Sequence, residues 1–278
     1  MTLVPTREIM DAALTAGTGV GAFNVIHLET AHGLVAGAES VGRSVILQIS
    51  QNCVRYHGAL EPIALAAMAI ARAAAVPVAM HLDHADDEEL VEQAIGLGFG
   101  SVMFDAAHRG YDDNVAATLR VVTRAHAAGL YVEAELGEIA GKVGAHATGV
   151  RTDPVEARAF VDATGVDALA VAVGSSHAMT ERSAALDLEL VTRLHERVPV
   201  PLVLHGSSGV SDEQLRAAIR AGMTKINVST RFAGLFTRVI REYLAEYPRA
   251  VDSRSYLAHG REAVTVEAAR LLDLFATP

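Results

Sequence analysis

The sequence predicts an α/β protein folded as a single (β/α)8 TIM barrel, and three observations support this prediction. Short apolar runs recur eight times along the 278 residues, a length within the usual range of one barrel domain. Each run is followed by a polar or glycine turn and then by an Ala- and Leu-rich stretch typical of a helix. No linker or change in composition marks a boundary, so we expect residues 1–278 to form one domain.

The eight runs are too short for helices and are continuously apolar, as parallel strands buried on both faces are. They span residues 20–25, 45–50, 77–82, 101–104, 131–136, 168–173, 201–204 and 225–228. Strands that alternate with helices form right-handed βαβ units and a parallel sheet. Eight such units close into a barrel, and a doubly wound open sheet is the main alternative.

Capping residues mark several of the helices between these runs. Ser211 stands where a helix is expected to begin, with Gln214 three residues later, as in a capping box. Asp153 precedes Pro154, which suits the first position of a helix. Glycines follow four of the expected helices, where a left-handed C-cap is common: Gly98, Gly129, Gly165 and Gly222.

Composition limits the classes of function. The formal net charge is -10 and no basic stripe is present, so we expect no nucleic-acid partner. The single cysteine, Cys53, excludes an internal disulfide and a thiolate zinc cluster and suits a reducing cytoplasm. We find neither a signal-peptide pattern nor an apolar run of the ~18–20 residues that a membrane span requires. We therefore expect a soluble cytoplasmic protein with no membrane partner.

Polar side chains lie at the carboxyl end of every predicted strand. In chain order they are Asn24, Ser50, Asp83 with His84, Asp105, Glu135, His177, His205 and Asn227. In a (β/α)8 barrel these ends converge on one face, where active sites lie. Chance explains a few such placements but not all eight, so we expect the active site at this face.

Three of these residues are histidines from separate strands: His84, His177 and His205. Catalytic zinc takes three protein ligands and keeps one position open, so the three imidazoles predict a zinc site. Asp105 and Glu135 share the same rim. They are expected either to hold an ion in a second position or to orient the histidines through hydrogen bonds.

Asp83 directly precedes His84, and side chains of neighbouring strand residues point in opposite directions. The chain bends at a strand end, so both side chains can still face the cavity. A carboxylate beside a metal-bound substrate oxygen acts as a general acid or base. The alternative is that Asp83 caps a helix beginning near Ala85.

Two loops suit a phosphate group. Residues 204–210 (LHGSSGV) are small residues between a strand and a helix, and residues 227–230 (NVST) follow the last strand. Small residues let backbone N–H groups approach an anion at a helix N-terminus. Loops after strands seven and eight are the usual phosphate site of barrels, so we expect one here.

These residues resemble those of the class II fructose-bisphosphate and tagatose-bisphosphate aldolases. The matching segments are 22–25 (AFNV), 81–84 (HLDH), 101–105 (SVMFD), 132–137 (VEAELG), 204–209 (LHGSSG) and 225–230 (KINVST). The resemblance covers nearly the whole chain. It implies a zinc-dependent aldolase that reversibly cleaves a phosphorylated ketose into dihydroxyacetone phosphate and an aldehyde such as glyceraldehyde 3-phosphate.

The resemblance also implies roles for individual residues. His84, His177 and His205 would bind the catalytic zinc, which would polarise the ketone and stabilise the charge left when the bond breaks. Asp83 would take the proton from the C4 hydroxyl in cleavage. Asp105 and Glu135 would belong to the second metal position. The implied substrate contacts are Asn24, Ser50 on the aldehyde side, Ala178, Gly206, Ser207 and Ser208, Asn227, Val228, Ser229 and Thr230, and Arg254 on the distal phosphate. A homodimer or homotetramer is implied, with Arg254 reaching a neighbouring site, and so is a second divalent or a monovalent cation.

Four departures from the family pattern concern proton transfer and the substrate. Ala178 replaces a glycine after the sixth-strand histidine, and Ser229 replaces an aspartate or alanine. Residues 106–107 are Ala-Ala where the family has Gly-Ser. Residues 141–144 (GKVG) replace a loop that usually carries a glutamate, and Glu138 is the nearest carboxylate that could substitute for it.

Three alternatives remain at the level of function. A zinc hydrolase is disfavoured, because amidohydrolase-like barrels carry a His-x-His on strand one and this chain has Ala22-Phe23-Asn24. An aldolase of the same family could act on another phospho-ketose, for example in inositol catabolism. A non-catalytic phospho-sugar-binding or accessory subunit is the third alternative, although Asp83 and the three histidines are all retained.

Overall fold

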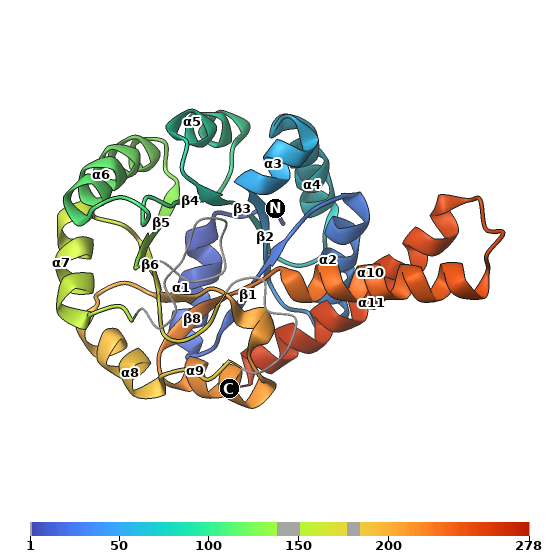
Figure 1. Cartoon of the computed structure of the whole chain (residues 1–278). Helices are drawn as coiled ribbons and strands as arrows, with labels where there is room; N and C mark the ends of the chain where they lie inside the picture. The colour runs from blue at the N-terminus through green and yellow to red at the C-terminus, as the bar shows by residue number, and fades with distance from the viewer. Residues whose placement is uncertain (1, 138–150, 177–183, 278) are drawn as a thin grey trace.

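The computed structural model describes residues 2–137, 151–176 and 184–277. Within them, eight parallel strands close into a barrel in chain order, and β8 pairs with β1. Helices cover the outside of this barrel (Figure 1). The predicted (β/α)8 fold is therefore confirmed, and the doubly wound open sheet is wrong.

The strands are β1 Val20–Asn24, β2 Val45–Ser50, β3 Val78–Ala85, β4 Ser101–Phe104, β5 Tyr131–Leu136, β6 Ala168–Val171, β7 Leu202–Leu204 and β8 Met223–Val228. The helices before β5 are α1 Thr6–Ala16, α2 Leu28–Val41, α3 Gln51–His57, α4 Glu61–Ala73, α5 Glu88–Leu97 and α6 Tyr111–Ala127. The later ones are α7 Pro154–Thr164, α8 Leu188–Arg197, the short 3-10 helix η1 Ser207–Gly209, α9 Asp212–Arg220, α10 Thr230–Glu246 and α11 Ser253–Ala276.

Two strands end at places that the apolar runs do not predict. β6 ends at Val171, because the backbone of Ala172 bonds with Thr152, whose N–H donates to the Ala172 carbonyl and whose hydroxyl accepts from the Ala172 N–H. β3 continues to Ala85 through a register shift against β4 between Leu82 and Ala85. The irregularity in β3 decides how the site is built.

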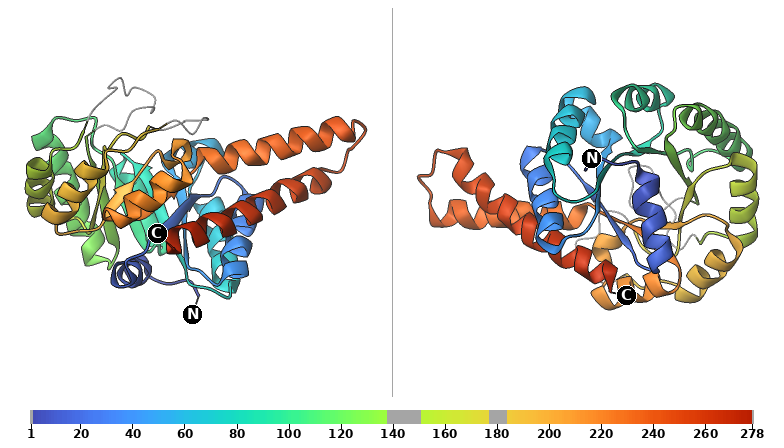
Figure 2. Two further views of the ribbon diagram at one scale, coloured as in Figure 1. Left: turned by 90° about the horizontal axis from the view of Figure 1, so that it is seen from below. Right: turned by 180° about the vertical axis from the view of Figure 1, so that it is seen from behind.

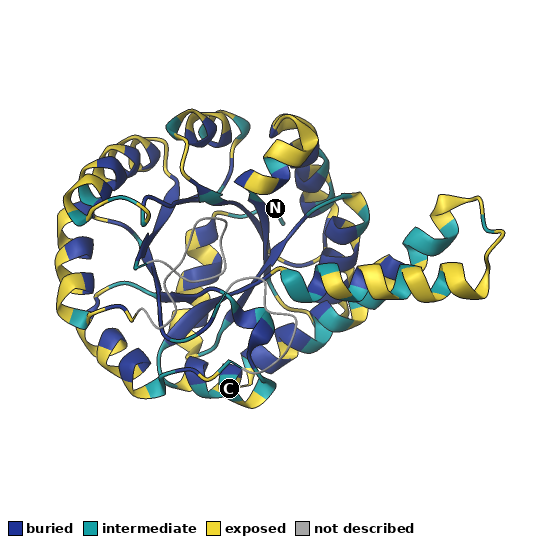
Figure 3. Cartoon of the chain, in the orientation of Figure 1, coloured by how far each residue is buried: buried dark blue, intermediate teal, exposed yellow. Residues whose placement is uncertain are grey.

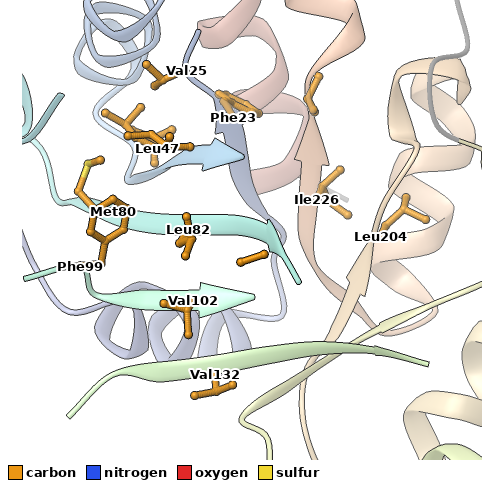
Figure 4. Packing of buried hydrophobic residues seen from close by; sticks show 14 of the residues in the cluster. Phe23, Val25, Leu47, Met80, Leu82, Phe99, Val102, Val132, Leu204 and Ile226 are labelled. Atoms are coloured by element: carbon orange, nitrogen blue, oxygen red, sulfur yellow. The ribbon is translucent and has the colours of Figure 1, made fainter. Parts of the chain in front are cut away.

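Alternate residues of each strand face different surroundings, as the two-residue repeat of a strand requires. The outward side chains pack under the helices and form the main core, which includes Phe23, Leu47, Leu82 and Ile226 (Figure 4). The inward positions are partly polar: Gln48, His81, Ser101, Glu133 and Lys225 are all buried. The expectation of strands that are apolar on both faces therefore holds for only part of the barrel interior, where an apolar cluster lies beside these polar side chains.

The predicted helix caps at Ser211 and Asp153 are confirmed. The Ser211 side chain accepts from the Gln214 N–H, and the Asp153 side chain accepts from the N–H groups of Val155 and Glu156. Asp83 does not cap the next helix. That helix, α5, begins only at Glu88, and its N-cap is Asp87.

Two features outside the eight βα units shape the molecule. Helix α1 closes the amino-terminal end of the barrel, where Ile9 and Met10 pack among the inward-facing apolar side chains (Figure 2). Helices α10 and α11 form an arm that projects away from the barrel (Figures 1 and 2). The outer faces of the helices and much of this arm are exposed (Figure 3). Among the helices of the described part of the chain, none is both long and apolar enough to cross a membrane.

Candidate active site

The carboxyl ends of the strands bring seven of the nine polar residues predicted at strand ends together in one buried cluster. Asn24, Asp83, Asp105, Glu135, His205 and Asn227 are each 9% exposed or less. His84 completes the cluster with a side chain that is one-fifth exposed. His177 and Ala178 lie outside the described residues, as do Glu138 and the loop of residues 141–144.

His84 and His205 face each other across the centre of this cluster. His84 Nε2 lies 3.0 Å from His205 Nδ1, and the two rings meet edge to face with centroids 4.6 Å apart. His84 has a φ of 49°, which is rare for a residue with a side chain. Together with the register shift in β3, this bend turns His84 to the same side as its neighbour Asp83.

Carboxylates hold the outer nitrogen of each imidazole. His84 Nδ1 lies 2.9 Å from Asp105 Oδ2, and His205 Nε2 lies 2.9 Å from Glu133 Oε1. An ionised carboxylate only accepts hydrogen bonds, so each outer nitrogen donates and each inner nitrogen keeps its lone pair. Two imidazole lone pairs therefore point at one place between the rings.

Glu135 supplies a third donor atom at that place. Its Oε2 lies 3.6 Å from His205 Nδ1, and ligand atoms of His84, Glu135 and His205 all lie within 4.8 Å of one another. Two imidazoles and a carboxylate are a donor set that zinc accepts. The residues present therefore fit a zinc ion. Asp105 is not in this set. Its bond to His84 Nδ1 is of the kind that orients a metal-binding histidine.

Asp83 is a buried carboxylate with one fixed oxygen. Asn24 Nδ2 donates to Asp83 Oδ2 at 2.9 Å, and Gln48 Nε2 donates to Asn24 Oδ1 at 2.9 Å. The other oxygen, Oδ1, lies 4.0 Å from His84 Nε2 and has no hydrogen-bond partner among the described residues. Burial acts to raise the pKa of Asp83, but the nearby His84, His205 and Lys225 and the Asn24 bond outweigh it and lower the pKa. The structure thus presents a charged carboxylate oxygen beside the imidazole pair.

The two predicted phosphate loops lie against each other. Ser207 Oγ donates to the Asn227 carbonyl at 2.5 Å, and Ser208 Oγ accepts from the Arg231 N–H at 3.1 Å. Gly206 has a φ of 66°, and a Cβ there would lie 2.6 Å from the Ser176 backbone. Only glycine fits this turn without strain.

The end of the second loop forms the start of a long helix. Val228 is the last residue of β8, Ser229 is the N-cap of α10, and Thr230 is its first residue. Ser229 makes no side-chain capping bond. The start of α10 therefore offers backbone N–H groups and the positive end of the helix dipole beside η1.

Two predicted residues make no hydrogen bond to this cluster among the described residues. Ser50 ends β2 in register with Asp83, but its hydroxyl caps α3, where it accepts from the Cys53 N–H at 3.2 Å. Arg254 lies in the first turn of α11, at the far end of the arm, and its nearly fully exposed guanidinium pairs with Asp252 at 2.7 Å. The structure does not bring Arg254 to the barrel of its own chain.

The polar residues one layer deeper in the barrel were not predicted from the sequence. Glu133, Lys225 and Gln48 reach the site from within, through His205 and Asn24. The two-residue repeat of a strand could have indicated two of these residues. Glu133 precedes Glu135, and Lys225 precedes Asn227, by two positions. Side chains two apart on a strand face the same way, so these residues could have been found.

Comparison with known proteins gives one consistent result. The family model described as "Fructose-bisphosphate aldolase class-II" matches residues 4–277. Curated fructose-bisphosphate aldolases are similar over almost the whole chain: that of Thermus caldophilus is 37% identical and covers 99% of this chain and 98% of the relative. That of Geobacillus stearothermophilus is 38% identical and covers 95% of this chain and 93% of the relative. Among solved structures, the YdjI aldolase from Escherichia coli K12 superposes with a TM-score of 0.84 at 31% identity, over 98% of this chain and 97% of the other.

Proposed function

The chain belongs to the class II fructose-bisphosphate aldolase family, and from this premise we propose how its own residues carry out the aldolase reaction. Members of this family are zinc-dependent lyases that cleave a phosphorylated ketose to dihydroxyacetone phosphate and an aldehyde. We further propose that residues 1–278 form one domain and that the enzyme acts in the cytoplasm.

The observation that carries the proposal is the imidazole pair with its two orienting carboxylates. His84 Nε2 and His205 Nδ1 are 3.0 Å apart, and Asp105 and Glu133 hold the opposite nitrogens. Such convergent lone pairs suit a cation. We assign His84 and His205, with His177, as zinc ligands, and Asp105 and Glu135 to a second position for an ion. When bound, zinc supplies Lewis acidity toward the ketone oxygen.

Asp83 is proposed as the general base in cleavage and the general acid in condensation. Its Oδ1 lies on the imidazole side of the carboxylate, and its lowered pKa keeps it charged. A charged carboxylate can accept the proton of the C4 hydroxyl as the carbon–carbon bond breaks. Asn24 fixes the carboxylate by occupying Oδ2, so that Oδ1 stays available.

Gly206, Ser207 and Ser208 and residues 227–230 are proposed to hold the phosphate of the dihydroxyacetone phosphate half. The two loops are joined by hydrogen bonds. Helix α10 begins at Thr230, the last residue of the second loop, and the dipole of that helix favours an anion at its N-terminus. Ser50 and the backbone at Ala178 complete the proposed substrate contacts, Ser50 on the aldehyde side.

We propose that a second copy of the chain completes the site. Arg254 lies in the first turn of α11, at the end of the arm that projects away from its own barrel (Figure 1). The same arm exposes Leu244, Tyr247 and Val251, the last at 95%. A homodimer, or a tetramer built from dimers, would bury these side chains and place Arg254 at the distal phosphate of the neighbouring site.

The proposal is tested by a coupled assay for triose phosphate release over a panel of ketose mono- and bisphosphates, with and without a chelator. Release from fructose or tagatose 1,6-bisphosphate that the chelator abolishes and zinc restores is the expected result. Preference for another phospho-ketose would change the assigned substrate. If the zinc-loaded protein cleaves no member of the panel, the proposed activity is wrong.

A further inference from the structure

A buried ion pair lies directly beneath the imidazole pair, inside the barrel. Glu133 on β5 and Lys225 on β8 are each 1% exposed, and Lys225 Nζ lies 2.7 Å from Glu133 Oε2. The interior layers of such barrels are usually filled by branched aliphatic side chains. A buried ion pair is often no more stabilising than apolar side chains of the same size, so stability alone does not explain this one.

Both oxygens of the Glu133 carboxylate are engaged. Oε1 accepts from His205 Nε2 at 2.9 Å, while Oε2 accepts from Lys225 Nζ at 2.7 Å. The bond to Lys225 therefore prevents the carboxylate from rotating away from His205. Asn227 Nδ2 also lies 3.0 Å from His205 Nε2, and an amide nitrogen only donates. The ionised Glu133 carboxylate can only accept, so its bond to His205 places the ring proton on Nε2 and leaves Nδ1 facing His84 and Glu135.

Lys225 also contacts polar side chains that lie nearer the amino-terminal end of the barrel. Its Nζ lies 3.4 Å from His81 Nε2, and His81 Nδ1 lies 2.7 Å from the hydroxyl of Ser101. Ser101 in turn lies 2.7 Å from the hydroxyl of Thr6 on α1. A continuous polar column thus connects His205 with the helix that closes the other end of the barrel.

We propose that Glu133 is a positioning residue that sets the tautomer and orientation of His205 for zinc, and that Lys225 fixes Glu133 for this task. The inference rests on the proposed zinc site. Carboxylates that orient a ligating histidine typically contribute 10- to 100-fold to metal affinity.

Zinc affinity, measured by competition with a chromophoric chelator, tests the inference in a set of variants. Glu133→Gln leaves Lys225 buried without its counter-charge, so it is expected to lower both the melting temperature and the zinc affinity. The double variant Glu133→Gln with Lys225→Met removes both charges. We expect it to regain much of the melting temperature while zinc still binds roughly 10- to 100-fold more weakly than in the wild type.

A carboxylate at the other end of the barrel provides the matched control. Asp167 is largely buried and pairs with Arg7 at 2.5 Å and with His126 at 2.8 Å. Asp167→Asn is expected to lower the melting temperature without changing zinc affinity. The visible spectrum of the cobalt-substituted protein should likewise change in the double variant and stay unchanged in the control.

A measurement on the wild-type holoenzyme does not depend on any variant folding. In protein labelled with 15N-histidine and loaded with zinc, the ring proton of His205 should lie on Nε2 and exchange slowly. A ring proton on Nδ1 would overturn the inference, and so would a double variant with wild-type zinc affinity and cobalt spectrum. If His205→Ala itself retains full zinc affinity, the proposed zinc site fails instead, which separates the two claims.

Discussion

At the scale of single residues, Asp83 carries the clearest prediction. Its carboxylate is buried, is held by Asn24 and keeps Oδ1 toward the imidazole pair. Asp83→Ala is expected to lower the cleavage rate by ~10²–10⁴-fold, the usual contribution of a general acid or base. Zinc content should remain at the wild-type level, because the variant leaves His84 and His205 in place. Steady-state kinetics and metal analysis of the same preparation check both parts.

Asp83→Asn tests whether the carboxylate, and not only the shape of the side chain, is required. It keeps the size of the side chain but cannot accept the proton, so it should be as inactive as Asp83→Ala. Wild-type turnover in either variant would remove Asp83 from the proposed mechanism.

The orientation of Asp83 and His84 shows which feature of the site the sequence could not predict. Residue types and strand ends predict that Asp83 and His84 belong to the site, but the alternation of a strand would separate them. They face the same way because β3 shifts register against β4 and His84 adopts a positive φ. That irregularity depends on how β3 pairs with the next strand, β4, so the sequence around Asp83 and His84 does not reveal it.

At the scale of elements, the close contact of α2 with α11 depends on glycine. A Cβ at Gly37 would lie 2.6 Å from the Thr265 carbonyl and 2.7 Å from the Ala268 Cβ. Gly37→Ala should therefore destabilise the protein, by ~1–3 kcal/mol as overpacking does, although alanine is the better helix former.

Gly96 in α5 is the matched control, because a Cβ there meets nothing within 4 Å. Gly96→Ala should stabilise the protein by up to ~1 kcal/mol through helix propensity. Urea unfolding of the two variants checks the pair. Equal effects at both positions would show that the α2–α11 contact is looser than the structure indicates.

An ion-pair cluster joins α11 to two other helices. Glu267 accepts from Arg231 on α10 and from Arg270, and Arg270 also donates to Asp212 on α9 at 2.7 Å. Burial acts to raise the pKa of Glu267, but the Arg270 bond and the Arg231 charge outweigh it and lower the pKa. Because the pKa of Glu267 is lower in the folded protein than in the unfolded chain, its ionised form stabilises the fold. This stabilisation is present above the unfolded-state pKa and is lost as the pH falls through the folded-state pKa.

Glu267→Gln should therefore destabilise the protein at neutral pH, by ~1–2 kcal/mol for charge-assisted hydrogen bonds. The difference in free energy of unfolding between this variant and the wild type should stay constant from pH 7 to 5. It should narrow below ~4.3, the ordinary pKa of glutamate. Urea unfolding of both proteins over this pH range measures it. A difference that grows on acidification would contradict the assignment.

At the scale of the whole molecule, the arm predicts that each site needs two chains. Asp83→Ala and Arg254→Ala should each be weakly active alone. Unfolded together and refolded as a mixture, they should regain about a quarter of wild-type activity, because half of the dimers are mixed and each mixed dimer holds one intact site. Analytical ultracentrifugation should show a dimer or larger. A monomeric enzyme, or a mixture with no recovery, would contradict the shared site.

The fold as a whole was more predictable than the connections across it. The strands place apolar side chains toward the helices, and several helices begin at a capping side chain, as at Ser211 and Asp153; both signals are local. The confirmed barrel follows from such signals, whereas the confirmed family follows from the resemblance of segments such as 81–84 and 204–209. The deeper Glu133–Lys225 pair depends instead on which side chains meet across the barrel interior, since β5 and β8 are not neighbours. The position of Arg254 depends on where the arm projects.

The central claim is that this chain is an aldolase whose zinc is held at the His84–His205 pair. The most direct test is zinc reconstitution of the metal-free enzyme, followed by cleavage of its preferred ketose bisphosphate. Activity should rise in proportion to added zinc until the catalytic sites are filled, and His205→Ala should gain neither zinc nor activity under the same conditions. Full activity in the metal-free enzyme, or wild-type zinc binding in His205→Ala, would contradict the account.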